Sequence, residues 1–413
     1  MQNNNARLWP EVRLQDIQAP KKWALTGGPF GSNLVQKDYV DQGIPVIRGA
    51  NLSKDSRFNL NGFVFVTKEK ADELLPNNAT PGDVIFTQRG TLGDVGYIPK
   101  DCKYPRFVIS QSQMKLTVDE LKADPLWIYY YFRLPSTISR IQNLAFSSGV
   151  PHINLSILRE FKIHLPPITI QHKIVAILSA YDDLIENTTH RIHILKKIIE
   201  EIYSEWFVKF KFPGHENVKI INSELGNLPE GWEVKNFREI FSLEYGKSLP
   251  AKIRIPGKYP VYGSSGIVGN HNEYSVKAPG IVVGRAGNAG DVHWASENFF
   301  PVDSCFYVKI IDKEVPLHYI YYQLINANLK NLISGAAVPG INRNAIYLLP
   351  FIKPLNCVLK EFERIALSIF FLISELNSII LNLRNTRDFL LPKLISGEID
   401  ISEIDIKISE VNT

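Results

Sequence analysis

Residues 171–206 read QHKIVAILSAYDDLIENTTHRIHILKKIIEEIYSEW and contain neither glycine nor proline. Apolar side chains recur along this stretch with gaps that alternate between four and three residues, and only Thr188 interrupts them. The stripe consists of Ile174, Leu178, Tyr181, Ile185, Ile192, Leu195, Ile199, Ile202 and Trp206. Such an alternation places one narrow apolar stripe on a helix, which a partner helix then has to cover. The stretch therefore predicts one helix that is roughly 45 to 55 Å long at 1.5 Å per residue.

A second stretch with the same pattern occupies residues 361–390, which read EFERIALSIFFLISELNSIILNLRNTRDFL. Its stripe consists of Ile365, Ile369, Leu372, Leu376, Ile379, Leu383, Thr386 and Leu390. The two stripes differ by a constant offset of 191 residues, which indicates an internal repeat. We therefore expect the second helix to cover the first. An ordinary helical hairpin inside a core is the alternative.

The repeat extends into the segments before each helix. The matching pairs are PLWIYYYF (125–132) and PLHYIYYQL (316–324), SSGVPHIN (147–154) and SGAAVPGIN (334–342), IPVIRG (44–49) and YPVYG (259–263), and PGDVIFTQRGTLGDV (81–95) and PGIVVGRAGNAGDV (279–292). They predict two copies of one unit, each a globular part followed by a long helix. Short Val-, Ile- and Phe-rich runs predict strands, and the segments starting at Pro125 and Pro316 predict helices. The predicted fold class is therefore α+β.

The two copies also predict the domain boundaries. The first globular part covers residues 1–165, its long helix 166–212, the second globular part 213–355, its long helix 356–400, and a tail 401–413. The segment 211–231 is polar and contains proline and glycine, which is typical of a connection between domains. Pro392 and Gly397 are expected to end the second helix.

The composition is that of a globular protein, not of a uniformly basic one. Of the 413 residues, 45% are hydrophobic and 21% are charged, and the net charge is only +4. A nucleic-acid partner would therefore have to bind local basic patches. Three widely spaced cysteines, and a start without a signal-peptide pattern, predict a cytoplasmic protein. The apolar run 365–383 is interrupted by Glu375, Asn377 and Asn382, which favours a packed helix over a membrane span.

Motifs that would indicate an enzyme are missing from the sequence or incomplete. The GKS at residues 246–248 lacks the glycine that a phosphate-binding loop needs five residues earlier, where the chain has Phe241. Gly284, Gly287 and Gly290 fit a tight turn better than a dinucleotide fingerprint. Neither the NPPY nor the DPPY tetrapeptide of amino-group methyltransferases occurs. The sequence thus predicts no catalytic residue, no metal site and no cofactor in this chain.

The loops of both copies carry side chains that typically bind double-stranded DNA. Arginine and lysine hold phosphates or read guanine, asparagine and glutamine pair with adenine, and serine or tyrosine completes phosphate contacts. The candidates in the first copy are Arg48, Lys54, Arg57, Gln88, Arg89, Thr91, Lys103 and Arg106. The candidates in the second copy are Lys247, Lys252, Arg254, Tyr262, Ser264, Ser265, Arg285, Asn288, His293 and Arg343. Solvated surface loops are the alternative interpretation for any single residue.

With this layout the chain resembles the specificity subunits of type I restriction-modification enzymes. The resemblance is carried by HINLSILREFKIHLPPITIQHKIVAIL (152–178), by its weaker copy GINRNAIYLLPFIKPL (340–355), by PGDVIFTQRGTLGDVGY and YGSSGIVG, and by the ending LLPKLISGEI. These segments, with the repeat of half the chain length, cover most of the sequence. The second copy departs from the family pattern at KEFERIALS, where the first copy has QHKIVAILS.

The resemblance implies two strand-rich target-recognition domains, each gripping one half of an asymmetric, bipartite DNA site. It also implies that the two long helices lie antiparallel as a spacer between the domains, in a pseudo-two-fold arrangement. A spacer of roughly 45 to 55 Å corresponds to about 13 to 16 base pairs. Family members are not catalytic alone. Two modification subunits supply S-adenosylmethionine and the adenine-methylating site, and restriction subunits with motor and nuclease activity supply ATP and magnesium.

Two other functions remain open from the sequence. One is a self-contained DNA methyltransferase or nuclease. A methyltransferase would need a cofactor pocket and a flipped-base pocket, and the sequence carries no trace of either; nor does it contain a convincing acidic trio followed by lysine for metal-assisted DNA cleavage. A repeat-built scaffold that binds protein only is the other alternative.

Overall fold

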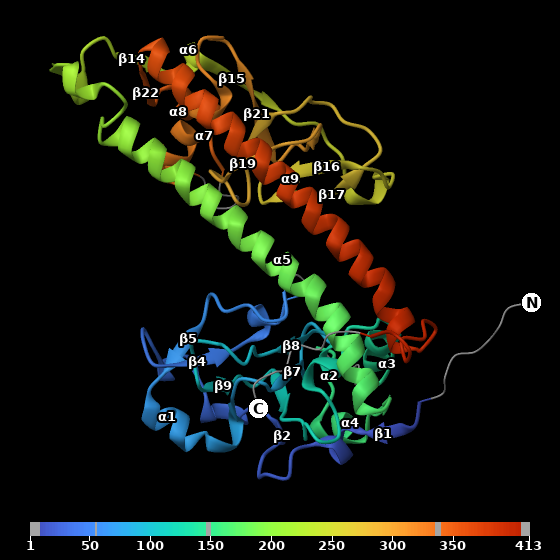
Figure 1. Ribbon diagram of the computed structural model, residues 1–413. Coiled ribbons are helices and arrows are strands. Elements are labelled where there is room, and N and C mark those ends of the chain that lie inside the picture. Colours follow the sequence, from blue (N-terminus) through green and yellow to red (C-terminus); the bar gives the residue numbers. More distant parts are fainter. Residues whose placement is uncertain (1–8, 54–55, 146–149, 335–339, 406–413) are drawn as a thin grey trace, which may run out of the picture. The chain divides into compact units, whose positions relative to one another are not determined.

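The computed structural model of the chain is composed of two compact units, each with helices and strands (Figure 1). It describes residues 9–53, 56–145, 150–334 and 340–405. Unit 1 comprises Met1–Thr189 and Ile379–Thr413, and unit 2 comprises His190–Ser378. The predicted α+β class is confirmed.

The described residues of unit 1 form three sheets and four short α-helices. Its strands are β1 (Glu11–Arg13), β2 (Leu25–Gly27), β3 (Tyr39–Val40), β4 (Ile44–Ile47), β5 (Val64–Val66), β6 (Asn78–Ala79), β7 (Val84–Thr87), β8 (Val95–Tyr97), β9 (Phe107–Ile109), β10 (Gln113–Leu116) and β11 (Lys162–His164). Its short helices are α1 (Lys68–Glu73), α2 (Pro125–Phe132), α3 (Pro135–Asn143) and α4 (Leu155–Glu160). The strand orders are β2-β10-β7-β8, β3-β5-β4-β9-β6 and β1-β11.

In unit 2, the part that the structure describes has four sheets and three short α-helices. Its strands are β12 (Ile220–Ser223), β13 (Gly226–Pro229), β14 (Glu233–Asn236), β15 (Phe241–Tyr245), β16 (Tyr259–Gly263), β17 (Gly266–His271), β18 (Gly280–Gly284), β19 (Val292–Ala295), β20 (Phe300–Pro301), β21 (Cys305–Ile310) and β22 (Pro350–Lys353). Its short helices are α6 (Phe237–Ile240), α7 (Leu317–Asn326) and α8 (Arg343–Tyr347). The strand orders are β15-β21-β18-β19, β17-β16-β20, β14-β22 and β12-β13.

The internal repeat is confirmed by the matching topology of the two units. The four-stranded sheets β2-β10-β7-β8 and β15-β21-β18-β19 have the same strand order, and β1-β11 corresponds to β14-β22. The repeated Asn154 and Asn342 cap α4 and α8, where their side chains accept hydrogen bonds from backbone N–H groups (2.9 Å each). The predicted polar connection contains the β12–β13 hairpin. Ile220 and Ile221 are both exposed there, so the hairpin lacks the alternation that identifies a half-buried strand.

The two long helices are α5 (Ile168–Tyr203), green in Figure 1, and α9 (Asn356–Ile395), in orange and red. α9 continues through Pro392, so the expected end at this residue is wrong. Proline removes one backbone hydrogen bond from the last turn. The burial of Leu391, Leu394 and Ile395, which are 2–4% exposed, offsets that loss. The helix then ends before Gly397, which has the left-handed φ of +73°.

The apolar stripe of α5 agrees with the prediction, whereas that of α9 agrees only in part. On α5, Ile174, Leu178 and Ile199 are at most 1% exposed. On α9, Leu372 and Ile379 are 45% and 47% exposed and Thr386 is exposed as well, so the prediction is wrong for these three residues. The predicted stripe assumed that α9 packs only against another long helix. In the structure, α9 also packs against the short helix that covers the sheet in each unit.

Each unit buries its own half of the long helices. In unit 2, Phe362 of α9 lies 6.3 Å, ring to ring, from Tyr203 of α5 and from Tyr319 of α7. In unit 1, Trp127 and Tyr130 of α2 are at most 1% exposed and belong to one core with the buried residues of α5 and α9. The repeated aromatic helices α2 and α7 therefore connect each sheet to the long helices.

A buried ion cluster joins α2 to both long helices in unit 1. Asp182 of α5 accepts hydrogen bonds from the Tyr130 hydroxyl of α2 (2.7 Å) and from Nη1 of Arg387 of α9 (2.5 Å). The side chains of Asp182 and Arg387 are 2% and 3% exposed. Lys173, nearer the start of α5, donates to the carbonyl of Ser402, beyond the end of α9 (2.7 Å). Within unit 1 the two helices therefore run in opposite directions.

Among the described residues, α9 is the one helix whose length and composition would suffice to cross a membrane. It carries Glu363, whose Oε2 lies 2.9 Å from Nδ1 of His318, as well as the buried Arg387. Both polar side chains have partners inside their own unit. These contacts favour the packed helix that the sequence predicted.

Candidate nucleic-acid interface

The predicted residues Gln88 and Arg285 occupy equivalent positions in the two units. Gln88 directly follows β7, which pairs with β8, and Arg285 directly follows β18, which pairs with β19. The hydrogen bonds are Gln88 N–H to Ser112 O (2.7 Å) and Ile153 N–H to Gln88 O (3.0 Å) in unit 1, and Arg285 N–H to Ser304 O (2.9 Å) and Ile341 N–H to Arg285 O (2.9 Å) in unit 2. Matching backbone bonds thus place a glutamine in one copy where the other copy has an arginine.

The turns of these two hairpins also match. Gly90 and Gly93 have φ values of +99° and +98°, and Gly287 and Gly290 have φ values of +78° and +85°. Glycine adopts this left-handed conformation without strain, whereas other residues do not. The tight turn that the glycine spacing predicted in the second copy is confirmed. The glycines therefore fix the backbone conformation of each turn and, with it, the positions of the residues on either side.

The side chains of the β7–β8 hairpin are available to a ligand. Gln88 is half-buried, and its side-chain amide has no hydrogen-bond partner within the described part of the chain. Arg89 and Thr91, on the same turn, are exposed. An amide that can pair with adenine and a guanidinium that can bind phosphate therefore lie on one hairpin.

In unit 2 two guanidinium groups lie over one tyrosine ring. Arg285 and Arg343 are 5.6 Å and 5.0 Å from the centroid of Tyr245. Nε of Arg285 donates to the carbonyl of Asp303 (3.0 Å), and Nη1 of Arg343 donates to that of Leu243 (3.4 Å). The terminal nitrogens of Arg285 have no hydrogen-bond partner among the residues that the structure describes. The ring orients Arg285 and leaves its fork free to bind.

Two exposed aromatic residues near these hairpins were missed by the sequence interpretation. Tyr245 is 51% exposed and precedes Gly246, and Phe30 is 85% exposed and lies two residues after Gly28. A Cβ at Gly28 or Gly246 would lie 2.1 Å from a backbone carbonyl, so neither position accepts a side chain. The sequence signal that could have identified both residues is an aromatic side chain within two positions of a glycine in each copy.

The β16–β17 turn packs against the β18–β19 hairpin. Nε2 of His293 donates to the carbonyl of Ser264 (3.1 Å), and a Cβ at Gly284 would lie 3.0 Å from the same carbonyl. Ser265 and Asn288 are exposed. The two hairpins therefore gather hydroxyl, amide and imidazole groups that the sequence alone could only place in separate loops.

The predicted lysines lie on the surface. Lys247 and Lys252 are exposed, and Nζ of the exposed Lys103 lies 4.7 Å from the ring centroid of Tyr104. Lys54 lies outside the described residues. Exposed ammonium groups of this kind can bind phosphates without first breaking an ion pair.

Two predicted residues of unit 2 are instead held by their own chain. Arg254 donates through Nε to the carbonyl of Leu249 (3.2 Å) and through Nη1 to that of Val268 (2.7 Å), so it closes its loop. Tyr262 is only 6% exposed, and its hydroxyl donates to the carbonyl of Trp294 (3.3 Å). Burial raises the pKa of Tyr262 to about 12. We leave Tyr262 out of the proposed contact set because a buried side chain cannot reach DNA.

Arg48 and Arg106 of unit 1 also have partners within the chain. Nη2 of Arg48 donates to the carbonyl of Gly62 (2.9 Å). Nε of Arg106 donates to the side-chain oxygen of Asn78 (2.9 Å), and its Nη1 pairs with Asp72 (2.6 Å). Both residues therefore shape their loops, and a DNA contact would use only the part of each guanidinium that stays free.

Arg57 pairs with two carboxylates of α5 within unit 1. Its guanidinium donates to Glu186 through Nε (3.1 Å) and Nη2 (2.7 Å) and also pairs with Asp183, and its side chain is 15% exposed. Burial lowers the pKa of Arg57, but the hydrogen bonds and charges of Glu186 and Asp183 outweigh it and raise the pKa above the ordinary value. Arg57 thus anchors its loop on α5.

The described residues contain no group of three or more His, Cys, Asp or Glu side chains that could hold a metal ion. The chemistry that the two sets of loops share is hydrogen bonding and positive charge. These are the means by which proteins read base edges and hold phosphates.

A comparison with known families places these loops in context. The sequence model of the type I restriction modification DNA specificity domain matches residues 11–197 and 229–355, which together are most of the chain. The chain belongs to this family. The two matches of the specificity domain coincide with the two copies of the repeat.

Related proteins agree with this assignment to the specificity-domain family. The chain is 26% identical over 423 residues to the type I restriction enzyme MjaIX specificity subunit of Methanocaldococcus jannaschii, covering 96% of this chain and 94% of that protein. It is 27% identical over 196 residues to the MjaVIII specificity subunit of the same organism, covering 48% of this chain and 40% of that protein. Its fold is similar to the S subunit of a type I restriction-modification system from M. genitalium, with a TM-score of 0.57, 20% identity, and coverage of 95% of this chain and 97% of that one.

The predicted family is therefore confirmed, and with it the role of DNA sequence recognition in a type I restriction-modification system. Specificity subunits are not catalytic, because catalysis resides in other subunits of the complex. The expectation that this chain is not itself an enzyme is confirmed by its family.

Proposed function

We propose that the chain recognises a bipartite double-stranded DNA site, with unit 1 reading one half and unit 2 reading the other. The observation that carries this proposal is the equivalent placement of Gln88 and Arg285 on matching hairpins. A glutamine amide pairs bidentately with adenine, and an arginine guanidinium pairs bidentately with guanine. Because the two copies present different side chains at the same position, we expect the two half-sites to differ in sequence.

Exposed cations of each unit supply the phosphate contacts in this proposal. These residues are Arg89 and Lys103 in unit 1, and Lys247 and Lys252 in unit 2; all four are exposed. The other proposed contacts are Arg48, Lys54, Thr91, Arg106, Arg254, Ser264, Ser265, Asn288, His293 and Arg343; Arg57 is left out because its guanidinium is paired with Glu186 and Asp183. Phosphate contacts orient the protein on the duplex but carry little sequence information, so the two hairpin positions supply the discrimination.

The proposed partners dock on the long helices. Leu367, Phe371, Leu381 and Phe389 of α9 are 53%, 68%, 59% and 64% exposed. At about 100° per residue, Leu367 and Phe371 in unit 2 lie about 40° apart around the helix, and Leu381 and Phe389 in unit 1 lie about 80° apart. We propose that two modification subunits bind such exposed apolar stripes and that restriction subunits then join the complex in the cytoplasm. S-adenosylmethionine and ATP are bound by those subunits, and this chain needs no cofactor.

Replacement of Phe371 by aspartate is expected to weaken the binding of a modification subunit about 30-fold or more. An aromatic residue at the centre of an interface typically contributes 2 kcal/mol or more, and a buried charge would add a desolvation cost. Calorimetric titration with purified modification subunit measures the change. Ser368→Asp adds the same charge to an exposed position outside the stripe and is the matched control. Equal losses in the two variants, or full affinity in Phe371→Asp, would exclude this stripe as the docking surface.

Long-read sequencing of a bacterial genome that carries this chain and its candidate modification subunit tests the function directly. We expect an adenine-methylated motif with two short, different halves and a fixed gap, which disappears when either chain is omitted. A motif with only one half would contradict bipartite recognition. A stable complex of the two chains that methylates no motif would favour a scaffold that binds protein only.

A further inference from the structure

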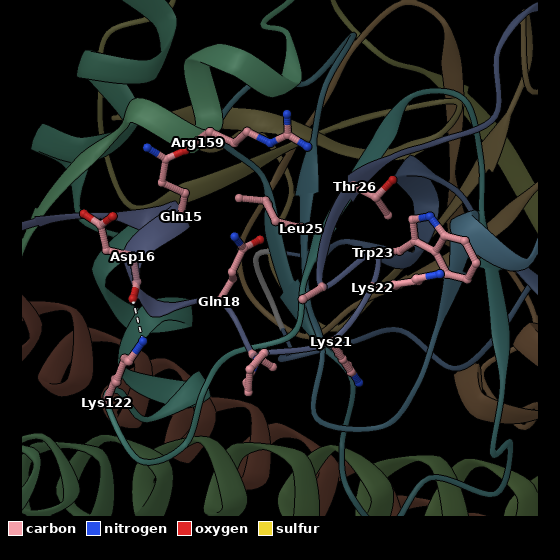
Figure 2. A pocket seen from close by; sticks show the side chains of 13 residues that line it. Gln15, Asp16, Gln18, Lys21, Lys22, Trp23, Leu25, Thr26, Lys122 and Arg159 are labelled. Carbon is pink, nitrogen blue, oxygen red and sulfur yellow. Dashed lines mark hydrogen bonds between the residues drawn. The ribbon is translucent and has the colours of Figure 1, made fainter.

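Unit 1 has an open polar hollow outside the hairpin surface described above. It has a volume of about 620 Å³ and is lined by residues 15–26 except Ile17, and by Lys122 and Arg159. Figure 2 shows the side chains of Lys21, Lys22 and Trp23 on one side of the hollow and that of Arg159 on another. The hollow thus lies where the chain enters β2, and nothing in the proposed base readout uses it.

The hollow has an excess of positive charge. Lys21, Lys22 and Arg159 are exposed, and within the described part of the chain none of them has an acidic partner. The acidic groups nearby are already neutralised. Asp16 binds Nε of Arg13 (3.0 Å), and Lys122 both pairs with Asp119 (3.5 Å) and donates to the carbonyl of Asp16 (3.1 Å; dashed in Figure 2). Three unpaired cations around one concave surface favour an anionic ligand with several charges.

Trp23 presents its indole at the rim in a strained conformation. The residue has a φ of +59° and is 44% exposed. A bulky residue rarely adopts a positive φ and is rarely this exposed. The surrounding backbone fixes this geometry. The N–H of Ala19 donates to the carbonyl of Thr117 (2.9 Å), and the N–H of Thr117 donates to the carbonyl of Ala24 (2.7 Å). A rigid loop that holds an exposed aromatic face beside two lysines is suited to a ligand with both phosphates and flat or apolar groups.

The hollow is close to the surface that we propose reads the bases. Trp23 and Gly28 are five residues apart, so their Cα atoms are separated by at most about 17 Å. A Cβ at Gly27 would lie 3.5 Å from Oε1 of Gln88, so this end of β2 touches the reading hairpin. A distance of about 17 Å corresponds to about five nucleotides along one strand of the duplex. A DNA molecule held by the hairpin therefore has phosphates within reach of the hollow.

We propose that this hollow binds the DNA backbone flanking the half-site read by unit 1, with Lys21, Lys22 and Arg159 on the phosphates and Trp23 against a sugar or base. The inference rests on the proposed DNA-recognition function and extends it: the footprint continues about five base pairs past the bases that are read. These contacts are independent of sequence and add affinity without changing the motif.

The test compares two duplexes in complexes of the full chain with its modification subunit. One duplex ends at the half-site of unit 1, and the other extends about eight base pairs beyond it. Changing Lys21, Lys22 and Arg159 together to alanine is expected to lower the slope of log affinity against log salt by about two to three on the long duplex. On the short duplex the slope should stay unchanged. Exposed Lys68, Lys277 and Lys360, changed together to alanine, provide a charge-matched control.

Trp23→Gly tests the aromatic face without added strain, because glycine adopts a φ of +59° readily. We expect about a fivefold loss of affinity on the long duplex and none on the short one. Equal slopes for wild type and triple variant on the long duplex would overturn the inference, as would an equal loss on both duplexes. Saturable binding of ATP to the hollow, with DNA affinity unaffected by the variants, would overturn it in favour of a nucleotide site. If the wild type fails to select the motif on the short duplex, the proposed recognition function itself fails.

Discussion

Replacement of Asp182 by alanine is expected to lower the free energy of unfolding of unit 1 by about 3 to 5 kcal/mol. The change leaves the guanidinium of Arg387, which is 3% exposed, with only the surface residue Asp388 as a charged partner. It also leaves the buried Tyr130 hydroxyl without its acceptor, which by itself costs about 1 to 3 kcal/mol. Because these residues lie on α2, α5 and α9, the loss should loosen the attachment of the sheet to both helices in unit 1.

Hydrogen exchange measured by mass spectrometry distinguishes this local effect from global unfolding. We expect faster exchange in α2 and in the adjoining parts of α5 and α9, with unit 2 unchanged. Asp183→Ala is the matched control, because this neighbouring carboxylate is 61% exposed and pairs at the surface, where such pairs contribute about 0 to 1 kcal/mol. If Asp182→Ala exchanges like the control, the buried cluster does not stabilise unit 1.

Exchanging the side chains at the two equivalent hairpin positions is expected to change one base preference in each half of the site. Gln88→Arg should move the preference at one position of the first half-site from adenine towards guanine, and Arg285→Gln should do the reverse in the second. A bidentate contact to the correct base contributes about 1 to 3 kcal/mol, which corresponds to about 5- to 150-fold discrimination. The rest of the motif and the gap should stay the same.

Selection from a randomised duplex library, followed by sequencing, reads every position of the site at once. Lys252→Ala provides the contrast: if this exposed lysine contacts phosphate as proposed, the variant should weaken all sequences alike and reduce the slope of log affinity against log salt by about one. A uniform loss of affinity in Gln88→Arg and Arg285→Gln, with no change in base preference, would mean that these side chains do not read bases.

The two units reach the same topology with different chemistry at the corresponding contact. Where unit 1 has the buried ion cluster of Asp182, unit 2 packs α7 mainly through rings, with one polar pair: Tyr203 stacks on Tyr322 at 5.3 Å, Trp294 stacks on His318 at 4.5 Å, and Nδ1 of His318 lies 2.9 Å from Oε2 of Glu363. Ring packing tolerates small shifts better than a buried ion pair, which loses much of its stability when one partner moves. Substitutions at this contact should therefore be tolerated better in unit 2.

The candidate surface was only partly accessible from the sequence. Side-chain type made Gln88 and Arg285 candidates, and the structure places both beside hairpin turns, which are encoded locally by their glycines. The same reasoning could not distinguish Arg57 or Tyr262 from free surface residues. Arg57 is paired by carboxylates more than 120 residues away. Tyr262 is buried by Val282, Phe299 and Cys305, which lie further along the chain. Which polar groups stay free is decided by such long-range contacts.

The family, the two long helices, the repeat and the α+β class all follow from patterns in the linear chain. Helical periodicity and turn residues act over a few positions, and an internal offset is visible without any structure. The register of α9, its passage through Pro392, the pairing of Asp182 with Arg387 and the hollow beside Trp23 do not follow from those patterns. They depend on side chains brought together from distant segments, and packing energy at such contacts outweighs local preference.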